Sequence, residues 1–255
     1  MLHVDVQGEG PDLVLLHGWA MHSGIWSDWA QQLSRWFRVY LVDLPGHGDS
    51  PCCQRGGGLD DWAGAVLEVV PDGAWWLGWS LGGLVALAAA RHPGSMRGLA
   101  LLATSPRFVT AADWPQATDV KVFDEFARQL QADAARTLSR FLSLQVRSAD
   151  GSGETLRRLR SQLSKKPPAA SEALSSGLNF LRQADMRQVL AATELPLFWL
   201  LGERDTLVPA GVRHEFPGVR ASVIAGAAHA PFLSHPEACT EQLKAWLLAQ
   251  SGVAV

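Results

Sequence analysis

A serine flanked by glycines at a fixed spacing is the first chemical signal in the sequence. The run Gly78-Trp79-Ser80-Leu81-Gly82 matches the pattern Gly-x-Ser-x-Gly and follows the apolar stretch Trp75 to Leu77. In a tight strand-to-helix turn, side chains two positions before and after the serine would clash, so glycine is needed at both places. The turn exposes the hydroxyl and puts helix N–H groups beneath a reacting carbonyl. The pattern predicts a nucleophilic Ser80, although a plain glycine-rich turn would share it.

An acid and a histidine follow two later apolar runs. Asp205 comes just after Leu197 to Leu201, and His229 comes just after Ala221 to Ile224. A single aspartate or histidine at such a place is usually structural, but the chain order Ser, Asp, His is that of a known catalytic triad. His229 would accept the proton of Ser80, and Asp205 would fix the tautomer and stabilise the imidazolium. We therefore expect acyl transfer through a serine ester.

Such chemistry also needs two N–H donors for the developing oxyanion. The dipeptide His17-Gly18 follows the apolar run Leu13 to Leu16, which places Trp19 to supply one backbone N–H, and Leu81 would supply the other. The alternative for His17-Gly18 is a plain turn. The loop from Asp43 to Gly48 has no Walker lysine, so we interpret it as a tight turn with a structural His47 rather than a phosphate cradle.

Seven short apolar runs bounded by turn residues predict buried strands that position these residues. Helix-length segments between several of them, at 59–70, 81–91 and 236–248, indicate a mostly parallel sheet with helices on both faces. We expect the first two runs to form an antiparallel hairpin around Gly8 to Pro11. The runs are Leu2 to Val6, Leu13 to Leu16, Val39 to Val42, Trp75 to Leu77, Leu99 to Ala103, Leu197 to Leu201 and Ala221 to Ile224.

The alternation stops in the middle of the chain, where helical periodicity predicts segments at 120–130, 132–144, 154–164 and 169–181. We therefore predict a core made of residues 1–105 and 193–255 and a helical lid inserted at 106–192. Residues 107–187 carry 13 basic and 9 acidic side chains, while the remainder carries 9 and 16. A basic lid on an acidic body would suit an acidic partner, although solvated helix faces would give the same count.

Composition excludes several other classes of protein. The 255 residues are 47% hydrophobic and 18% charged with a net charge of −3, which fits a globular protein and argues against a nucleic-acid partner. Cys52, Cys53 and Cys239 form neither a disulfide framework nor a metal-binding spacing, and no histidine cluster suggests a metal. With no basic and apolar leader and no long apolar run, we expect a cytoplasmic protein without a membrane segment.

Together these motifs resemble the α/β-hydrolase superfamily along nearly the whole chain. They are His17-Gly18-Trp19, the loop Asp43 to Gly48, Gly78 to Gly83, Asp205 and Ala228-His229-Ala230-Pro231. Within the superfamily, the Trp in Gly-Trp-Ser-Leu-Gly-Gly, the stretch Arg140 to Gln145 and the stretch Ala228 to Pro236 are similar to the BioH-type pimeloyl-acyl-carrier-protein methyl ester esterases of biotin synthesis.

The resemblance implies roles for residues inside and outside the lid. The triad would be Ser80, Asp205 and His229, with Trp19 and Leu81 contacting the ester. The acyl channel beneath the lid would be lined by Phe141, Leu142, Ser143, Leu144 and Gln145. Lid arginines would hold the acidic carrier protein and its phosphate-bearing arm, and those matching are Arg136, Arg140, Arg157 and Arg160.

The resulting expectation is a monomeric serine carboxylesterase, without a metal or cofactor, that hydrolyses the methyl ester of a pimeloyl chain on an acyl carrier protein. A broad carboxylesterase acting on small esters is the nearest alternative, because a triad fixes acyl chemistry but not the acyl group. The second alternative is a ligand-binding protein of the same fold that performs no catalysis, against which the intact triad argues.

Overall fold

The computed structural model describes residues 1–52 and 57–251; residues 53–56, with Cys53, and residues 252–255 lie outside the described part. Seven strands form one sheet in the order β1-β3-β2-β4-β5-β6-β7, and every neighbouring pair except β1 with β3 is parallel. All seven predicted strands are present, as β1 (Val4–Gln7), β2 (Asp12–Leu16), β3 (Arg38–Val42), β4 (Ala74–Trp79), β5 (Met96–Leu102), β6 (Leu197–Gly202) and β7 (Arg220–Ile224).

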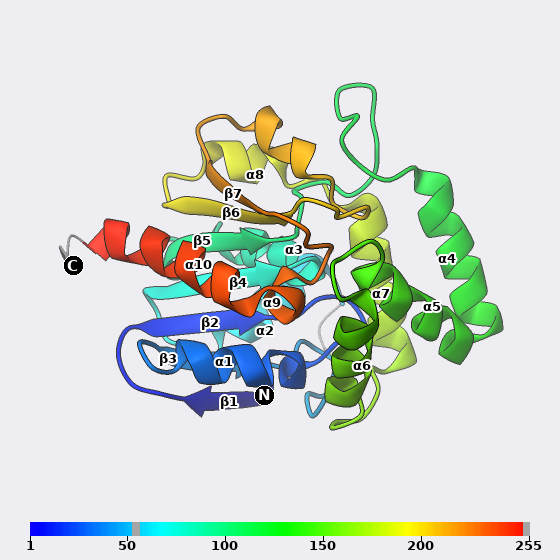
Figure 1. Ribbon diagram of the computed structural model, residues 1–255, viewed down its shortest axis with the longest axis horizontal. Helices are drawn as coiled ribbons and strands as arrows, with labels where there is room; N and C mark the ends of the chain where they lie inside the picture. The colour runs from blue at the N-terminus through cyan, green and yellow to red at the C-terminus, as the bar shows by residue number, and fades with distance from the viewer. Residues whose placement is uncertain (53–56, 252–255) are drawn as a thin grey trace.

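Alternate residues of the central strands enter two cores on opposite faces of the sheet. In β2, Leu13 and Leu15 pack on one side and Val14 and Leu16 on the other, all fully buried. Strands buried on both faces need helices on both faces, as Figure 1 shows. One layer holds the 3-10 turn η1 (Ser23–Trp26), α1 (Ser27–Leu33), α9 (Pro231–Ser234) and α10 (Pro236–Ser251); the other holds α2 (Leu59–Leu67), α3 (Leu81–Ala89), α8 (Arg187–Ala192) and the 3-10 turn η2 (Ala210–Glu215).

The predicted hairpin of the first two strands is wrong. β1 pairs antiparallel with β3, and β3 lies between β1 and β2. The connection at Gly8 and Gly10 passes close over the backbone before β3, where a Cβ on Gly8 would lie 2.4 Å from the carbonyl oxygen of Phe37. Both glycines have positive φ, so they serve this crossing instead of a two-strand turn.

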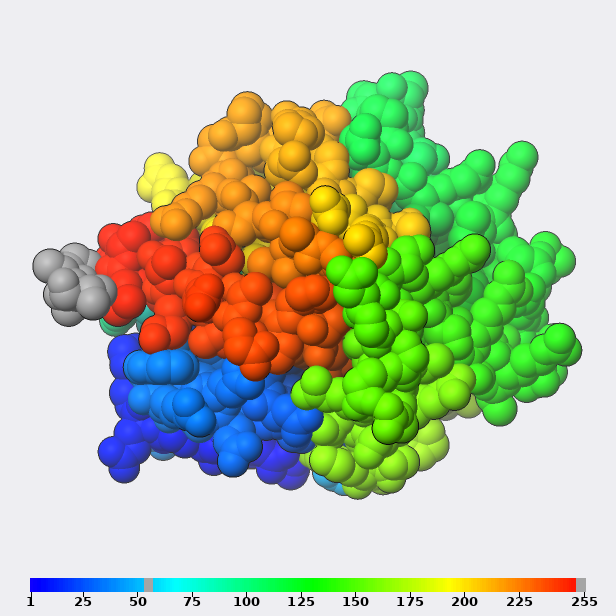
Figure 2. Space-filling view, viewed as in Figure 1, coloured from blue at the N-terminus to red at the C-terminus, as the bar shows by residue number. Residues whose placement is uncertain are grey.

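The helical insertion lies between β5 and β6. Its four long helices are α4 (Val120–Ala132), α5 (Ala134–Val146), α6 (Ser152–Leu163) and α7 (Ser171–Gln183), each overlapping a predicted helix. They cover the end of the sheet toward which the parallel strands run (Figure 1), and in the space-filling view they close that end of the molecule (Figure 2). The insertion therefore stands over the strand ends that carry the candidate catalytic residues.

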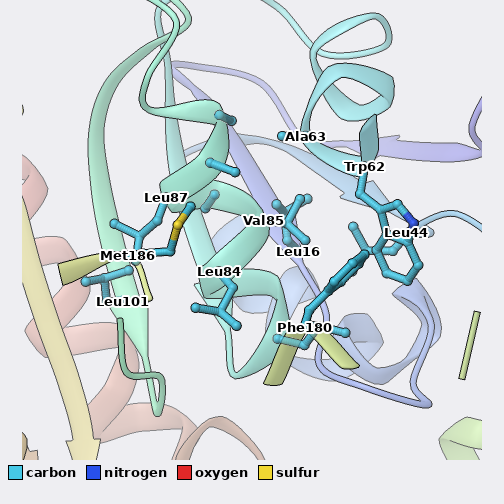
Figure 3. Packing of buried hydrophobic residues seen from close by; sticks show 14 of the residues in the cluster. Leu16, Leu44, Trp62, Ala63, Leu84, Val85, Leu87, Leu101, Phe180 and Met186 are labelled. Atoms are coloured by element: carbon cyan, nitrogen blue, oxygen red, sulfur yellow. The ribbon is translucent and has the colours of Figure 1, made fainter. Parts of the chain in front are cut away.

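The insertion shares its packing with the core. Phe180 of α7 and Met186 enter the same cluster as Trp62 of α2 and Leu84 of α3 (Figure 3), and the rings of Phe180 and Trp62 meet edge to face at 5.1 Å between centroids. This continuity fixes α7 in place relative to α3, the helix that begins at the candidate nucleophile. In the part of the chain that the structure describes, no helix is both long and apolar enough to span a bilayer.

Candidate active site

Ser80 lies in the turn between β4 and α3, as the glycine pattern predicts. Its backbone has φ 53° and ψ −118°, a conformation that a non-glycine residue adopts only when its surroundings enforce it. A Cβ on Gly78 would lie 2.5 Å from the carbonyl oxygen of Gly82, and a Cβ on Gly82 would lie 2.4 Å from that of Leu16. Neither position has room for a side chain, so both glycines are required by the turn.

Asp205 and His229 form a buried pair. His229 Nδ1 lies 2.7 Å from Asp205 Oδ2, and the other carboxylate oxygen accepts the N–H groups of Leu207 and Val208 at 2.8 and 3.0 Å. The carboxylate therefore favours a proton on Nδ1, which leaves the lone pair on Nε2. Among the described residues no hydrogen-bond partner occupies Nε2, so this nitrogen is free to act as a base.

The backbone of His229 is held from two sides. The indole Nε1 of Trp79, the residue directly before Ser80, donates to the His229 carbonyl at 2.8 Å. The N–H of His229 donates to the carbonyl of Gln145, at the end of α5, at 3.1 Å. The structure thus ties the Asp205–His229 pair both to the serine turn and to the insertion.

The predicted oxyanion loop lies against the serine turn. A Cβ on Gly18 would come 3.4 Å from Cβ of Ser80, so the loop carrying Trp19 approaches the nucleophile closely. Among the hydrogen bonds that the structure describes, none uses the N–H of Trp19 or that of Leu81. Both predicted donors are therefore available, and both belong to residues next to the candidate reacting centre.

Aromatic side chains from the insertion cover Trp19. Phe141 of α5 meets its ring at 90° with 4.8 Å between centroids, and Phe126 of α4 lies at 6.1 Å. The Trp19 indole donates to the carbonyl of Leu174 in α7 at 2.8 Å. Three helices of the insertion therefore contact one residue of the candidate oxyanion loop.

The predicted acyl-binding stretch lies on α5 with graded burial. Phe141, Leu142, Ser143 and Leu144 are half-buried, whereas Gln145 is 1% exposed. The side-chain oxygen and nitrogen of Gln145 have no partner among the described residues, while its carbonyl holds His229. A buried free amide beside the catalytic pair is suited to hydrogen bond with an ester or water.

The four predicted docking arginines divide between two helices. Arg136 and Arg140 are exposed on α5 and line a surface hollow of about 540 Å³ between α4 and α5. Arg157 and Arg160 are exposed on α6, where Arg157 pairs with Glu154 of its own helix. All four residues are thus exposed on the insertion.

Sequence reasoning missed a charged cluster centred on Lys166, which joins the α6–α7 connection to the core. Its Nζ lies 2.9 Å from Asp43 and 3.0 Å from Asp49. Burial alone would lower the pKa of Lys166, but the two carboxylates raise it above its usual value. Oxygens of these aspartates and a nitrogen of His3 lie within 4.8 Å of one another, and the Lys166 ammonium already pairs with both carboxylates. The only signal of this cluster in the sequence is the pair of aspartates at 43 and 49.

Burial also shifts the pKa values of Asp43, His17 and His47, which lie close to one another in and beside the loop 43–49. Burial raises the pKa of Asp43, but the N–H groups of Ser23 and Asp49, the His17 ring and the Lys166 ammonium together outweigh it, and the pKa is about 2. Burial lowers the pKa of His17 to about 3 and that of His47 to about 4. The predicted structural place of His47 agrees with its complete burial.

Known proteins resemble this chain along nearly all of its length. The family model of the alpha/beta hydrolase fold matches residues 11–236. A pimeloyl-[acyl-carrier protein] methyl ester esterase of Xanthomonas oryzae is 42% identical over 247 residues, 95% of this chain and 97% of that protein. The protein of the same name from Methylococcus capsulatus is 44% identical, covering 92% and 94%.

Solved structures agree on the fold. An esterase from Exiguobacterium antarcticum superposes with a TM-score of 0.86 at 22% identity, covering 96% of this chain and 95% of that one. At this identity the likeness shows the architecture alone, whereas the sequence relatives show the family. The chain therefore belongs to the alpha/beta hydrolase fold family and, within it, to the family of the pimeloyl-[acyl-carrier protein] methyl ester esterases.

Proposed function

We propose that this chain hydrolyses the methyl ester of pimeloyl-[acyl-carrier protein] to pimeloyl-[acyl-carrier protein] and methanol, the reaction named for its relatives. The observation that carries the proposal is identity of 41–44% over more than nine-tenths of the chain, insertion included. A buried Asp205–His229 pair tied to the turn of Ser80 supplies the chemistry that such a reaction needs.

The chain's own residues account for each step. Ser80 Oγ attacks the ester carbonyl while His229 Nε2 takes its proton, and the N–H groups of Trp19 and Leu81 stabilise the oxyanion. The tetrahedral intermediate then expels methanol, which receives the proton from His229. Water, activated by the same nitrogen, attacks the acyl-serine and releases the carboxylic acid and free Ser80. Throughout, Asp205 orients the ring and stabilises its charged form.

The insertion supports the choice of acyl group. Trp19 and Phe141 form an aromatic wall, and Gln145, one helical turn after Phe141 on the same face of α5, contacts His229 through its carbonyl. An apolar surface ending in one buried polar amide suits a methylene chain with an ester at its end. We assign the acyl chain to this side of α5.

The basic insertion supports a carrier-bound substrate. Acyl carrier proteins are acidic and present the acyl group on a phosphate-bearing arm, so the exposed arginines of the insertion would attract both. We assign this docking role to Arg136, Arg140, Arg157 and Arg160.

The test of the reaction compares hydrolysis of the carrier-bound methyl ester with that of short p-nitrophenyl esters, for the wild type and Ser80→Ala. We expect the wild type to prefer the carrier-bound ester and the variant to lose turnover of both while it remains folded. Turnover of the small esters only would return the function to a general carboxylesterase. Absence of all turnover would favour a binding protein.

The test of docking is a charge reversal in the insertion. Changing Arg136, Arg140 and Arg157 together to Glu should reduce kcat/KM for the carrier-bound ester at least about tenfold at low salt, and much less for a free ester, because steering acts on the charged partner. Equal losses on both substrates would contradict docking. The matched control reverses three exposed arginines outside the insertion, Arg35, Arg97 and Arg220.

A further inference from the structure

The two oxyanion donors proposed above belong to peptide groups whose carbonyls are those of Gly18 and Ser80. In a planar trans peptide the C=O and the N–H point in opposite directions. A group that holds the carbonyl oxygen therefore fixes the direction of the N–H on the other side. The structure supplies a buried side chain to each of these carbonyls.

Behind the serine turn, the holding group is Thr104. Its Oγ1 donates to the Ser80 carbonyl at 2.6 Å, and the N–H of Gly83 donates to the same oxygen at 2.9 Å. Thr104 has no exposed surface, and a Cβ on Gly83 would lie within 2.7 Å of three of its side-chain atoms. The hydroxyl is therefore packed directly beneath the first turn of α3.

Several contacts fix the position of Thr104. The chain leaves β5 through Ala103, which has φ 41° and donates its N–H to Leu200 at 2.8 Å. The Thr104 carbonyl accepts the indole N–H of Trp199 at 2.8 Å. A left-handed alanine is strained, and its presence here turns the next residue under the serine.

On the other side of the site, the holding group is His17. Its Nδ1 lies 2.8 Å from the Gly18 carbonyl, which also accepts the N–H of Met21 at 3.2 Å. Its Nε2 accepts the N–H of Leu44 at 3.0 Å, and this bond leaves the proton on Nδ1, so Nδ1 donates. The ring is completely buried, and its lowered pKa keeps it neutral at ordinary pH.

We propose that Thr104 and His17 are positioning residues of the oxyanion hole, each holding a carbonyl so that the N–H of Leu81 and that of Trp19 converge on the oxyanion. The inference rests on the proposed function. Donors fixed before the reaction need no reorganisation when charge develops, which is the main source of their effect. If the side-chain anchor is removed, the peptide group can tilt and its N–H leaves the direction of the oxyanion.

The first experiment replaces Thr104. Thr104→Val keeps the shape and removes the hydroxyl, and we expect kcat for a p-nitrophenyl ester to fall about tenfold, less than the 10²–10³-fold loss for deleting a donor. KM should stay within about twofold, and Thr104→Ser should restore most of kcat. The control is Thr240→Val on α10, away from these peptides, which removes the hydroxyl bond to the Pro236 carbonyl and the bond accepted from the Trp29 indole, both of 2.8 Å. This variant should leave kcat unchanged.

The second experiment separates the two ring nitrogens of His17. His17→Asn keeps a donor in the place of Nδ1 and loses the bond to Leu44, while His17→Gln keeps an acceptor in the place of Nε2 and loses the bond to Gly18. We expect His17→Asn to retain several-fold more kcat than His17→Gln. A trifluoromethyl ketone, whose adduct with serine carries an oxyanion, should lose affinity in parallel with kcat/KM across all the variants.

The outcomes separate the inference from the proposed function. An inactive wild type, or an active Ser80→Ala, would refute the function itself. An active wild type with unchanged kcat in Thr104→Val overturns the positioning role, and so does a kcat loss that Thr104→Ser does not restore. If Thr104→Val does not fold, the His17 pair decides, since equal kcat in His17→Asn and His17→Gln overturns the inference.

Discussion

Acid should weaken the folded state between pH 6.5 and 5, because two histidines are buried as neutral rings beneath the oxyanion loop. The rings of His17 and His47 are fully buried with centroids 5.1 Å apart. Burial lowers the pKa of His17 to about 3, with His47 adding to the effect, and lowers that of His47 to about 4, although Asp43 opposes both shifts. Unfolding returns both rings to water, where histidine titrates near 6.5.

The sign and size follow from proton linkage. Both folded pKa values lie below the unfolded value, so the unfolded chain binds more protons and the free energy of unfolding decreases as the pH falls. The stability is fully present above about pH 6.5. At pH 5 each histidine favours unfolding by about 2 kcal/mol, and the two together by about 4 kcal/mol. Asp43, with a pKa of about 2, contributes only at lower pH.

Urea unfolding followed by tryptophan fluorescence between about pH 8 and pH 5 measures this loss. His47→Asn removes one of the two rings and should make the loss smaller by about 2 kcal/mol. Burial also lowers the pKa of His22, which adds to the loss in the wild type and the variant alike. His92→Asn changes an exposed histidine and should keep the full loss. A wild type equally stable at both pH values, or a His47→Asn variant that loses as much as the wild type, would refute the reasoning.

Two further predictions concern the attachment of the insertion. Gly177→Ala places a Cβ 2.7 Å from Cδ1 of Trp19, so it should reduce the free energy of unfolding by about 1–3 kcal/mol and lower kcat as α7 shifts. Urea unfolding measures the first effect and steady-state kinetics the second. A fully stable and fully active variant would contradict the contact. Lys166→Met leaves the buried Asp43 carboxylate without its cation and should destabilise the chain by about 3 kcal/mol in the same assay, whereas Lys165→Met, on an exposed neighbour, should have little effect.

The order of the elements could be predicted because the sequence is locally consistent. Buried parallel strands appear as short apolar runs and helices as longer periodic segments, so all seven strands and the helices of the insertion were predicted. Pairing is different, because a strand's neighbour is decided by tertiary packing. β1 therefore lies beside β3 although the chain continues into β2, and no local pattern near Gly8 distinguishes the two arrangements.

The candidate site, like the fold, could be predicted only in part. Ser80, Asp205 and His229 could be predicted because each follows a strand end, and the structure joins Asp205 to His229. The hydrogen bonds that attach the insertion to His229 and Trp19 could not be predicted, since Gln145 and Leu174 act through backbone carbonyls that any residue would offer. Their partners lie far away in the sequence, and only the folded chain identifies them.

The two hydrogen bonds from the insertion give it a part in building the site. The α5 carbonyl of Gln145 holds the N–H of His229, and the α7 carbonyl of Leu174 holds the indole of Trp19. Both bonds end on residues that we assign to the chemistry, so the insertion completes the site as well as covering it. A chain shortened between β5 and β6 would lose a backbone partner of the base and the support of one oxyanion donor together. A minimal core without α5 and α7 should therefore be a poor esterase even toward small, freely diffusing esters, for which docking and acyl-chain recognition are irrelevant.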